Sequence, residues 1–338
     1  MEAHQVSRDL NDVVIGPYVD GDEHEILRVF TKVFGVERSL EAWRWQYLEN
    51  PAGTHIHLAK FPDGAVVSQF CGVPRRMKVR DEEYCFSEIV DSYTDPDYRQ
   101  GLKKPGLFAS TCYEFVNHFG RPDREIIMYG LPNPPAYRVG SRLLGYVKFY
   151  KIELLTKHLE GDAADPGDDV GGGVTAHPVE RFSDDVDQLY ASVSTHHDVM
   201  TIRDARYLNW RYTDRPDATY DQIEFRDAAG AIVGLCSLRH RWLDQPETVP
   251  AELLVGRDHP AVPHILRWIE ARSRARGADR IRAMFRPDSP EWTGLASLGY
   301  VPERSPFRLV ARTYEREVVP LDWLRDNWYV TMGDFDIV

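Results

Sequence analysis

Basic side chains and glycines gather in one short stretch of the chain, directly after a run of mainly apolar residues. The stretch reads TDPDYRQGLKKPGLF and spans residues 94–108. Glycine lets a backbone approach a ligand without a Cβ, and the N–H groups that begin a helix attract anions. We therefore expect the loop and the helix after it to bind a pyrophosphate, although solvated loop lysines are the simpler alternative. The residues expected to contribute are Arg99, Gln100, Gly101, Lys103, Lys104, Gly106 and Leu107.

Two acidic residues interrupt the apolar run that precedes this loop. Glu88 and Asp91 lie three positions apart in the segment SEIVDSY. A charged residue inside an apolar strand costs free energy unless it is used or paired, so either carboxylate is a candidate general base. On a regular strand this spacing puts the two side chains on opposite faces, so only one is expected to face a substrate. The structural alternative is a salt bridge to a helix.

Hydrophobic periodicity predicts the elements that position this loop. A strand over residues 87–93 leads into it, and a helix over Leu107–Phe119 follows, with its apolar residues mostly on one face. A short strand over Glu125–Tyr129, a helix over Pro134–Leu144 and a closing strand over Tyr146–Leu155 come next. Strands that lead into helices, with an antiparallel first half, predict an α/β or α+β fold. We expect a mixed sheet with helices on both faces.

A Trp-x-Tyr box with a proline four residues further on occurs twice, as Trp45-Gln46-Tyr47 with Pro51 and as Trp210-Arg211-Tyr212 with Pro216. A Leu-Gly-Tyr triplet follows each box about 90 to 100 residues later, at 144–146 and 298–300. Two landmarks in the same order predict a duplicated domain. The Gly- and Asp-rich segment 159–175 has little to bury, and we expect it to link domains 1–158 and 176–338.

Several other residues are expected to be structural. The corresponding segment of the second copy, LLVGRDHPAVPHILRW, lacks the basic glycine loop, so ligand binding is expected in the first copy. The aromatic residues of both boxes are expected to pack in the core or between the domains. The run at 196–198, His-His-Asp, has no further ligand at a useful spacing, so no metal site is expected. Asp334 and Asp336 in MGDFDIV could reach an amine, but a solvated tail is the expectation.

Composition narrows the classes of function. The chain has 338 residues and a formal net charge of −12, which disfavours nonspecific nucleic-acid binding. No apolar run reaches about 18 residues, so no membrane-spanning helix is expected. The N-terminal residues lack a basic-then-apolar signal, and the four cysteines form no CxxC pair. We expect a cytoplasmic protein with reduced thiols; the sequence does not indicate its oligomeric state.

The stretch around the loop resembles motif A of the GNAT superfamily of acyl-CoA-dependent N-acyltransferases. In that motif a central strand ends before a proline, Arg/Gln-x-x-Gly-x-Gly/Ala and a helix; here the strand and DPDYR match. The loop departs from the pattern: Leu102 occupies the expected glycine position after Arg99, and the alternative frame, KKPGLF, puts Phe108 at the second small position. A second similar segment is MYGLPNPPAYRVGSRLLGY, in which Asn133 and Ala136 are spaced as in the superfamily. The resemblance covers two tandem GNAT-like domains.

The resemblance implies roles for particular residues. A backbone N–H near Tyr93 or Thr94 would polarise the thioester carbonyl, and Asn133 would help to hold the pantetheine. The usual general acid, a tyrosine four residues before the glycine, is replaced by Ser141. Tyr137, one helical turn earlier, is the nearest tyrosine and the candidate acid.

The leading hypothesis is an acyl-CoA-dependent N-acyltransferase that transfers acetyl from acetyl-CoA to the primary amine of a small molecule in a ternary complex. The first domain would bind the donor, and the second would help to shape the acceptor site. One alternative is an aminoacyl or longer-acyl transferase on the same fold. The other is a GNAT-fold binding protein that has lost catalysis, for which the replacement at Ser141 argues.

Overall fold

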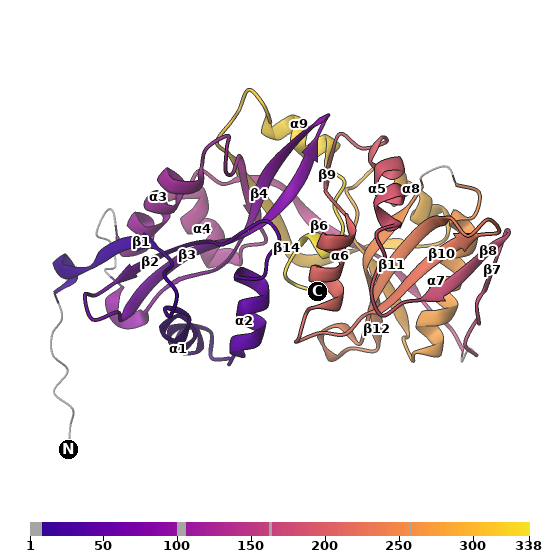
Figure 1. Ribbon diagram of the computed structural model, residues 1–338, viewed down its shortest axis with the longest axis horizontal. Coiled ribbons are helices and arrows are strands. Elements are labelled where there is room, and N and C mark those ends of the chain that lie inside the picture. The colour runs from indigo at the N-terminus through magenta and orange to yellow at the C-terminus, as the bar shows by residue number, and fades with distance from the viewer. Residues whose placement is uncertain (1–8, 100–105, 162–163, 257–258) are drawn as a thin grey trace, which may run out of the picture.

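The computed structural model describes residues 9–99, 106–161, 164–256 and 259–338 (Figure 1). Its strands are β1 (Val14–Pro17), β2 (His55–Lys60), β3 (Val66–Val79), β4 (Glu82–Thr94), β5 (Ile127–Gly130), β6 (Val147–His158), β7 (Asp169–Gly171), β8 (Val174–Pro178), β9 (Val199–Thr201), β10 (Asp221–Asp227), β11 (Ile232–His240), β12 (Glu247–Val255), β13 (Arg280–Ala283) and β14 (Val301–Thr313). Its α-helices are α1 (Glu23–Phe34), α2 (Leu40–Tyr47), α3 (Leu107–Phe119), α4 (Pro134–Leu143), α5 (Val186–Ser194), α6 (Ala205–Leu208), α7 (Val262–Ala275), α8 (Pro290–Ser297) and α9 (Leu321–Asn327).

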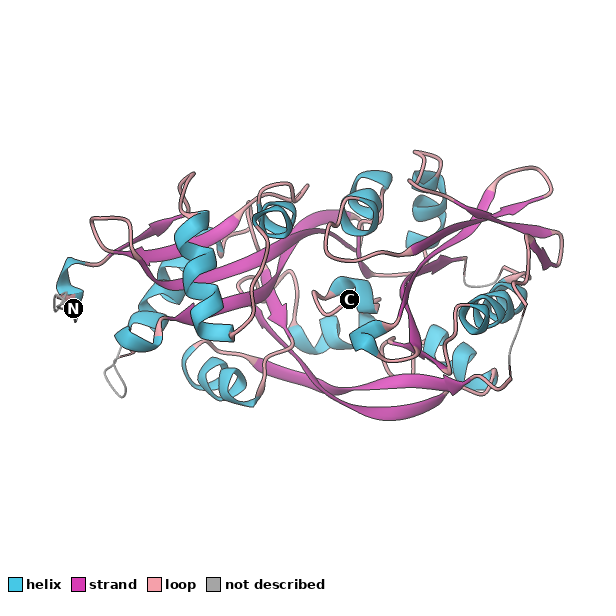
Figure 2. Ribbon diagram, turned by 90° about the horizontal axis from the view of Figure 1, so that it is seen from below, coloured by secondary structure: helices cyan, strands magenta, loops and turns pink. Residues whose placement is uncertain are grey.

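One mixed sheet runs through the molecule (Figure 2). Its strand order is β1-β2-β3-β4-β5-β14-β6-β13-β12-β11-β10-β8-β7, and β9 pairs with β3 off this path. Only the β4–β5 and β12–β13 pairs are parallel among the described strands. Phe70 packs with residues of α3, whereas its neighbour Cys71 belongs to the core that contains residues of α1. Because successive strand residues point to opposite faces, helices cover both faces, and the predicted fold class is confirmed.

The two halves of the chain exchange a strand. β14, near the C-terminal end, lies between β5 and β6, and β6 in turn pairs with β13 of the second half. The order of elements repeats: β2-β3-β4-α3-β5-α4-β6 in the first half corresponds to β10-β11-β12-α7-β13-α8-β14 in the second. This repeat agrees with the duplication that the boxes predict. The boundaries at 158 and 176 remain a prediction, because β6 takes part in both halves of the sheet.

The two Trp-x-Tyr boxes meet each other between the halves, where α2 and α6 lie (Figure 1). Trp45 Nε1 donates to Trp210 O at 2.6 Å, and Trp210 Nε1 donates to Trp45 O at 2.9 Å. The indole rings stack with centroids 5.3 Å apart and an interplanar angle of 20°. Both side chains are buried. The box tryptophans are thus interface aromatics, as the sequence predicts.

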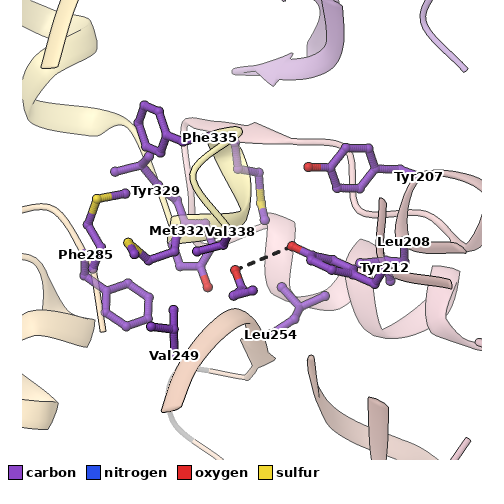
Figure 3. Packing of buried hydrophobic residues seen from close by; sticks show 14 of the residues in the cluster. Tyr207, Leu208, Tyr212, Val249, Leu254, Phe285, Tyr329, Met332, Phe335 and Val338 are labelled. Carbon is purple, nitrogen blue, oxygen red and sulfur yellow. Dashed lines mark hydrogen bonds between the residues drawn. The ribbon is translucent and has the colours of Figure 1, made fainter. Parts of the chain in front are cut away.

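The C-terminal segment is packed inside the protein, contrary to the expectation of a solvated tail. Met332, Phe335 and Val338 are fully buried in the core, among side chains of both β12 and the second box (Figure 3). Arg211 holds the segment by donating to the carbonyls of Gly333, Phe335 and Val338. A Cβ at Gly333 would lie 1.9 Å from the Tyr212 hydroxyl and 2.6 Å from Ala251 O, so only glycine fits there.

We predict that Trp45→Phe lowers the free energy of unfolding by about 1–2 kcal/mol, because it removes the N–H that satisfies the buried Trp210 carbonyl. Urea unfolding followed by far-UV circular dichroism measures the change. The matched control is Trp292→Phe, at a partly buried position on α8. A loss in Trp45→Phe no larger than the control's would mean that the reciprocal hydrogen bonds do not hold the halves together.

Candidate functional site

A cavity opens where β4 and β5 separate. The two strands pair in parallel from Phe86–Ile127 to Glu88–Tyr129, after which β4 continues to Thr94 while β5 ends at Gly130. The gap forms a cavity of about 220 Å³. Its walls come from β4, the segment after β5, α3, α4 and the C-terminal segment. The lining residues are Phe34, Phe70, 88–92, Phe108, 129–133, Ala136, Leu144, Tyr146, Val310, Asp336 and Ile337.

A β-bulge in β4 turns its carboxylates toward this cavity. Gln69 pairs with Tyr93 and Cys71 with Val90, so β4 has one residue more than β3 between these two pairs. Asp91, within the bulge, has a φ of 46°, in the left-handed region that Asp tolerates better than most residues. The extra residue changes the alternation of faces, and Glu88 and Asp91 both lie near the same side chain, Asp336, at the cavity. The expectation that they face opposite sides is therefore wrong.

Glu88 is buried within a network of donors. Its Oε2 accepts from Arg75 Nη2 at 2.9 Å, and its Oε1 accepts from the backbone N–H of Asp336 at 3.1 Å. Arg75 Nη1 also donates to the Tyr129 hydroxyl at 2.6 Å. That hydroxyl in turn donates to Asp334 O at 3.0 Å. Burial, and next the charge of Asp336, raise the pKa of Glu88 to about 8, against the opposing effect of Arg75. Glu88 can thus exchange a proton near neutral pH.

Asp91 is the partner of an arginine and a tyrosine. Its Oδ2 accepts from Arg38 Nη1 and, at 2.7 Å, from the hydroxyl of the box residue Tyr47. The Arg38 guanidinium lies over the Phe30 ring, 4.5 Å from its centroid. Burial and then Asp91 hold the pKa of Tyr47 well above its usual value, so the phenol remains a donor. The salt bridge that was the structural alternative for Asp91 is present.

Asp336 is the third carboxylate at the cavity; from the sequence it could reach an amine, but a solvated tail was the expectation. Its side chain is accessible to solvent because it lines the cavity, but the cavity walls bury it more deeply than a residue on the outer surface. That burial, followed by the nearby charge of Asp91, raises its pKa, and Arg38 and Arg75 oppose the shift. The three carboxylates and two guanidiniums form one charged cluster at the cavity wall.

The predicted carbonyl-polarising positions lie just beyond the cavity lining. The Tyr93 hydroxyl donates to Ile26 O at 2.9 Å, and the Tyr93 ring packs in the core. Thr94 Oγ1 is hydrogen-bonded to Ser68 Oγ at 2.9 Å. Since the cavity is lined by residues 88–92 of β4, backbone groups of that stretch lie closer to it than those of Tyr93 or Thr94.

The expected anion loop is described only at its two ends. Arg99 is exposed, and its Nε donates to Thr94 O at 3.3 Å. Gln100, Gly101, Lys103 and Lys104 lie outside the described residues.

Gly106 and Leu107 begin α3, whose N-terminal end has no side-chain cap among the described residues and no acidic residue in its first turn. The first turn of α3 thus carries no negative charge that would repel an anion. Leu107–Phe119 is helical, as predicted.

The predicted residues of the second segment are split between the cavity and its surroundings. Asn133 caps α4, accepting from Ala136 N at 2.9 Å, and lines the cavity. Tyr137 instead lies under Arg308, with the guanidinium 4.3 Å from the ring centroid, and is absent from the described lining. Tyr146 does line the cavity; its ring rests on Gly140, where a Cβ would lie 2.2 Å from it. Tyr129 also lines the cavity, but its hydroxyl donates to Asp334 O.

The remaining sequence features lie elsewhere. His196, His197 and Asp198 line a separate pocket in the second half. In the part of the chain that the structure describes, no three His, Cys, Asp or Glu side chains are grouped so as to hold a metal ion. None of the described helices combines the length and apolar character needed to cross a membrane.

Solved structures show which fold this is. The chain superposes on a GCN5-related N-acetyltransferase from Kribbella flavida with a TM-score of 0.63 at 16% identity, covering 91% of this chain and 73% of that one. The chain has the GNAT fold. A conserved protein of unknown function from Enterococcus faecalis V583 gives a TM-score of 0.65 at 14% identity, covering 90% of this chain and 73% of that one. No protein-family model matches the sequence, and no curated protein does.

A third GNAT-fold neighbour is N-myristoyltransferase from Saccharomyces cerevisiae, solved with bound myristoyl-CoA. Its TM-score is 0.57 at 10% identity, and the match covers 90% of this chain and 83% of that one. At these identities the likeness establishes the fold of the chain and leaves its activity to be argued from the site.

We predict that the stability of the protein falls as pH rises from about 5 to about 8, and that Glu88→Gln removes part of this slope. With a pKa raised from 4.5 to about 8, native Glu88 keeps a proton that the unfolded chain has released, so deprotonation favours unfolding over this range. Urea unfolding at several pH values measures the slope. The control is Glu114→Gln, at an exposed position of α3. Equal slopes in wild type and Glu88→Gln would contradict the raised pKa.

Proposed function

We propose that the protein is an acyl-CoA-dependent N-acyltransferase that transfers an acetyl group to the primary amine of a small molecule. The observation that carries this proposal is the bulge of β4, which brings Glu88 and Asp91 to a cavity between two separating parallel strands. The uncapped N-terminal end of α3 lies beside the same cavity, since Phe108 of its first turn lines it. A carboxylate cluster next to an anion site suits an amine acceptor and a phosphate-bearing donor.

The carboxylate cluster would handle the proton of the acceptor. Transfer requires an uncharged amine nitrogen to attack the acyl carbon, the C–S bond to break, and a proton to pass from nitrogen to a base. The thioester supplies the activated acyl group and a thiolate that leaves with a proton. Glu88 is the proposed base: with a pKa of about 8, its ionised fraction grows as pH rises through neutrality, and that form accepts the proton. The backbone N–H of Asp336 donates to Glu88, so the two residues are neighbours. The carboxylate of Asp336 lines the same cavity and can carry the proton onward.

Asp91 has a different proposed role. Its Oδ2 accepts from both Arg38 and Tyr47, so Asp91 connects β4 to these two side chains. We assign it to attracting the ammonium form of the acceptor and to holding the bulge. The acidic cavity wall favours a cationic small molecule as the acceptor, and the net charge of −12 adds to that preference.

The donor's phosphates are assigned to the loop before α3. Arg99, Lys103 and Lys104 would supply positive charge, and Gln100, Gly101, Gly106 and Leu107 would supply backbone N–H groups. Asn133, which lines the cavity from the start of α4, would contact the pantetheine. Tyr146 replaces Tyr137 as the candidate acid toward the leaving thiolate, because it lines the cavity and Tyr137 does not.

Aromatic side chains at the cavity favour a short acyl group. Phe70 and Phe108 meet edge to face with centroids 5.8 Å apart, and Phe70 also contacts Phe115 at 5.1 Å. Phe70, Phe108 and Tyr146 all line the cavity, so the space between the sheet and α3 is filled by rings. A longer acyl chain would have to displace them, which argues against the longer-acyl alternative.

One observation favours the non-catalytic alternative. Ser141, at the position where the resemblance implies an acid, is exposed and donates to Arg138 O within its own helix. A protein that binds acyl-CoA without transferring its acyl group would tolerate this arrangement. Binding of acetyl-CoA without product from any of a panel of primary amines would support it.

We expect calorimetric titration of acetyl-CoA to show saturable binding that weakens about tenfold or more in Arg99→Ala/Lys103→Ala/Lys104→Ala, since charge-assisted contacts to phosphate are lost. The matched control is Arg206→Ala/Arg267→Ala/Arg316→Ala, which removes three exposed cations from the second half. Failure of the folded wild type to bind acetyl-CoA or CoA would overturn the proposed function. Equal weakening by both triple variants would place the phosphates elsewhere.

We also expect Phe108→Ala to bind hexanoyl-CoA more tightly relative to acetyl-CoA than wild type does, by roughly tenfold, because it opens space for added methylenes. The ratio of the two dissociation constants measures the effect, because a substitution that weakens the binding of both donors equally leaves this ratio unchanged. Tyr113→Ala, an exposed position on the same helix, is the control. A wild type that already prefers hexanoyl-CoA would contradict the short-acyl assignment.

A further inference from the structure

A second cavity opens in the second half, where β12 and β13 separate. These strands pair in parallel at Glu247–Arg280 and Thr248–Ile281, after which β12 continues to Val255 while β13 ends at Ala283. The gap lies between α7 and α8, as the first cavity lies between α3 and α4. The duplicated halves thus each contain a gap between parallel strands, but the second gap has different walls.

The inner part of this second site is apolar. It has a volume of about 120 Å³, close to the ~150 Å³ of an apolar cavity that can hold a benzene ring. Its apolar walls come from β12, α7, α8 and the segment that follows β13. They are Leu253, Val255, Val262, Ile265, Leu266, Phe285 and Leu295. A hydrocarbon chain or ring can be buried there.

A polar chamber of about 340 Å³ continues from the apolar one, because His197, Phe285, Pro290, Glu291 and Tyr329 line both. His197 and Glu291 therefore stand at the junction, with Nε2 and Oε1 3.9 Å apart. The His197 ring packs against Tyr329 at 4.4 Å, which fixes its position. A polar head group attached to a buried hydrocarbon would lie beside these two side chains.

The charges of the polar chamber favour a cationic head group. The acidic side chains of Asp198, Glu291 and Asp326 line it, together with the guanidinium of Arg286. Arg325 binds Asp326, so the carboxylates of Asp198 and Glu291 carry the preference for a cation. Trp328 also lines it, and its buried indole N–H has no acceptor among the described residues.

We propose that this two-chamber site binds an amphipathic amine, with its hydrocarbon part between α7 and α8 and its ammonium group beside Glu291. The site is separate from the cavity of the first half. Trp328 stands between them, since it lines the polar chamber and packs edge to face against Tyr129, with centroids 4.9 Å apart. Tyr129 lines the first cavity. Binding here does not depend on the proposed acyl transfer.

Calorimetric titration with hexylamine, 1-hexanol and hexanoate tests the proposal on the full chain. We expect hexylamine to bind with a dissociation constant of about 1 mM or lower, and hexanoate not to bind. Glu291→Gln should weaken hexylamine binding about fivefold or more and leave hexanol binding unchanged, because it removes charge but not volume. Leu295→Trp, which fills the apolar chamber, should remove binding of both.

Asp336→Asn is the matched control, because it removes a carboxylate from the first cavity, which could also attract an amine. Hexylamine affinity unchanged by Asp336→Asn and reduced by Glu291→Gln assigns binding to the second half. The reverse pattern, equal binding of hexanoate, or no saturable binding by folded wild type would overturn the proposal. If Leu295→Trp does not fold, Glu291→Gln alone decides, since that side chain is partly exposed.

Discussion

The reciprocal hydrogen bonds between Trp45 and Trp210 are the contact on which the candidate site depends. Each indole N–H satisfies the carbonyl of the other box, so the two boxes are fixed relative to each other. Two residues after Trp45, Tyr47 donates to Asp91 at the bulge of β4. One residue after Trp210, Arg211 binds three carbonyls of the C-terminal segment. One interface contact therefore positions walls of the cavity that come from opposite ends of the chain.

Burial of the C-terminal segment is what brings Asp336 to Glu88. Arg203 anchors the segment, donating at 2.8 Å both to Glu252 and to Asp334, and all three are fully buried. Burying such an ion network carries a large desolvation cost. Its main contribution is therefore to fix the position of the C-terminal segment, and not to add net stability. Two residues beyond Asp334, the Asp336 backbone N–H donates to Glu88. The packing of this segment also brings the charge of Asp336 near Glu88, which raises the pKa of Glu88, whereas the Asp336 backbone N–H lowers it.

Local sequence patterns predicted the elements but not their pairing. The helix at 107–119 follows from the spacing of apolar residues, which acts within about a dozen residues. The exchange of β6 and β14 depends on contacts between residues about 150 apart, which no local period encodes. The bulge at Asp91 was missed because period-two alternation assumes a regular strand. The segment MGDFDIV was misread because its two aspartates suggest solvent, whereas their partners, Arg203 and Glu88, lie far away in sequence.

Duplication gave the molecule two gaps between parallel strands, and the side chains around each gap have diverged. In the first half, three carboxylates and several aromatic rings line the gap, and α3 begins beside it. In the second half, mainly apolar side chains line the corresponding gap, and polar groups line the chamber that continues from it. A parallel pair that separates leaves backbone groups unpaired, so each gap must be filled by side chains or by a ligand. The strand exchange keeps both gaps in one sheet, and Trp328 and Tyr129 form the wall that they share.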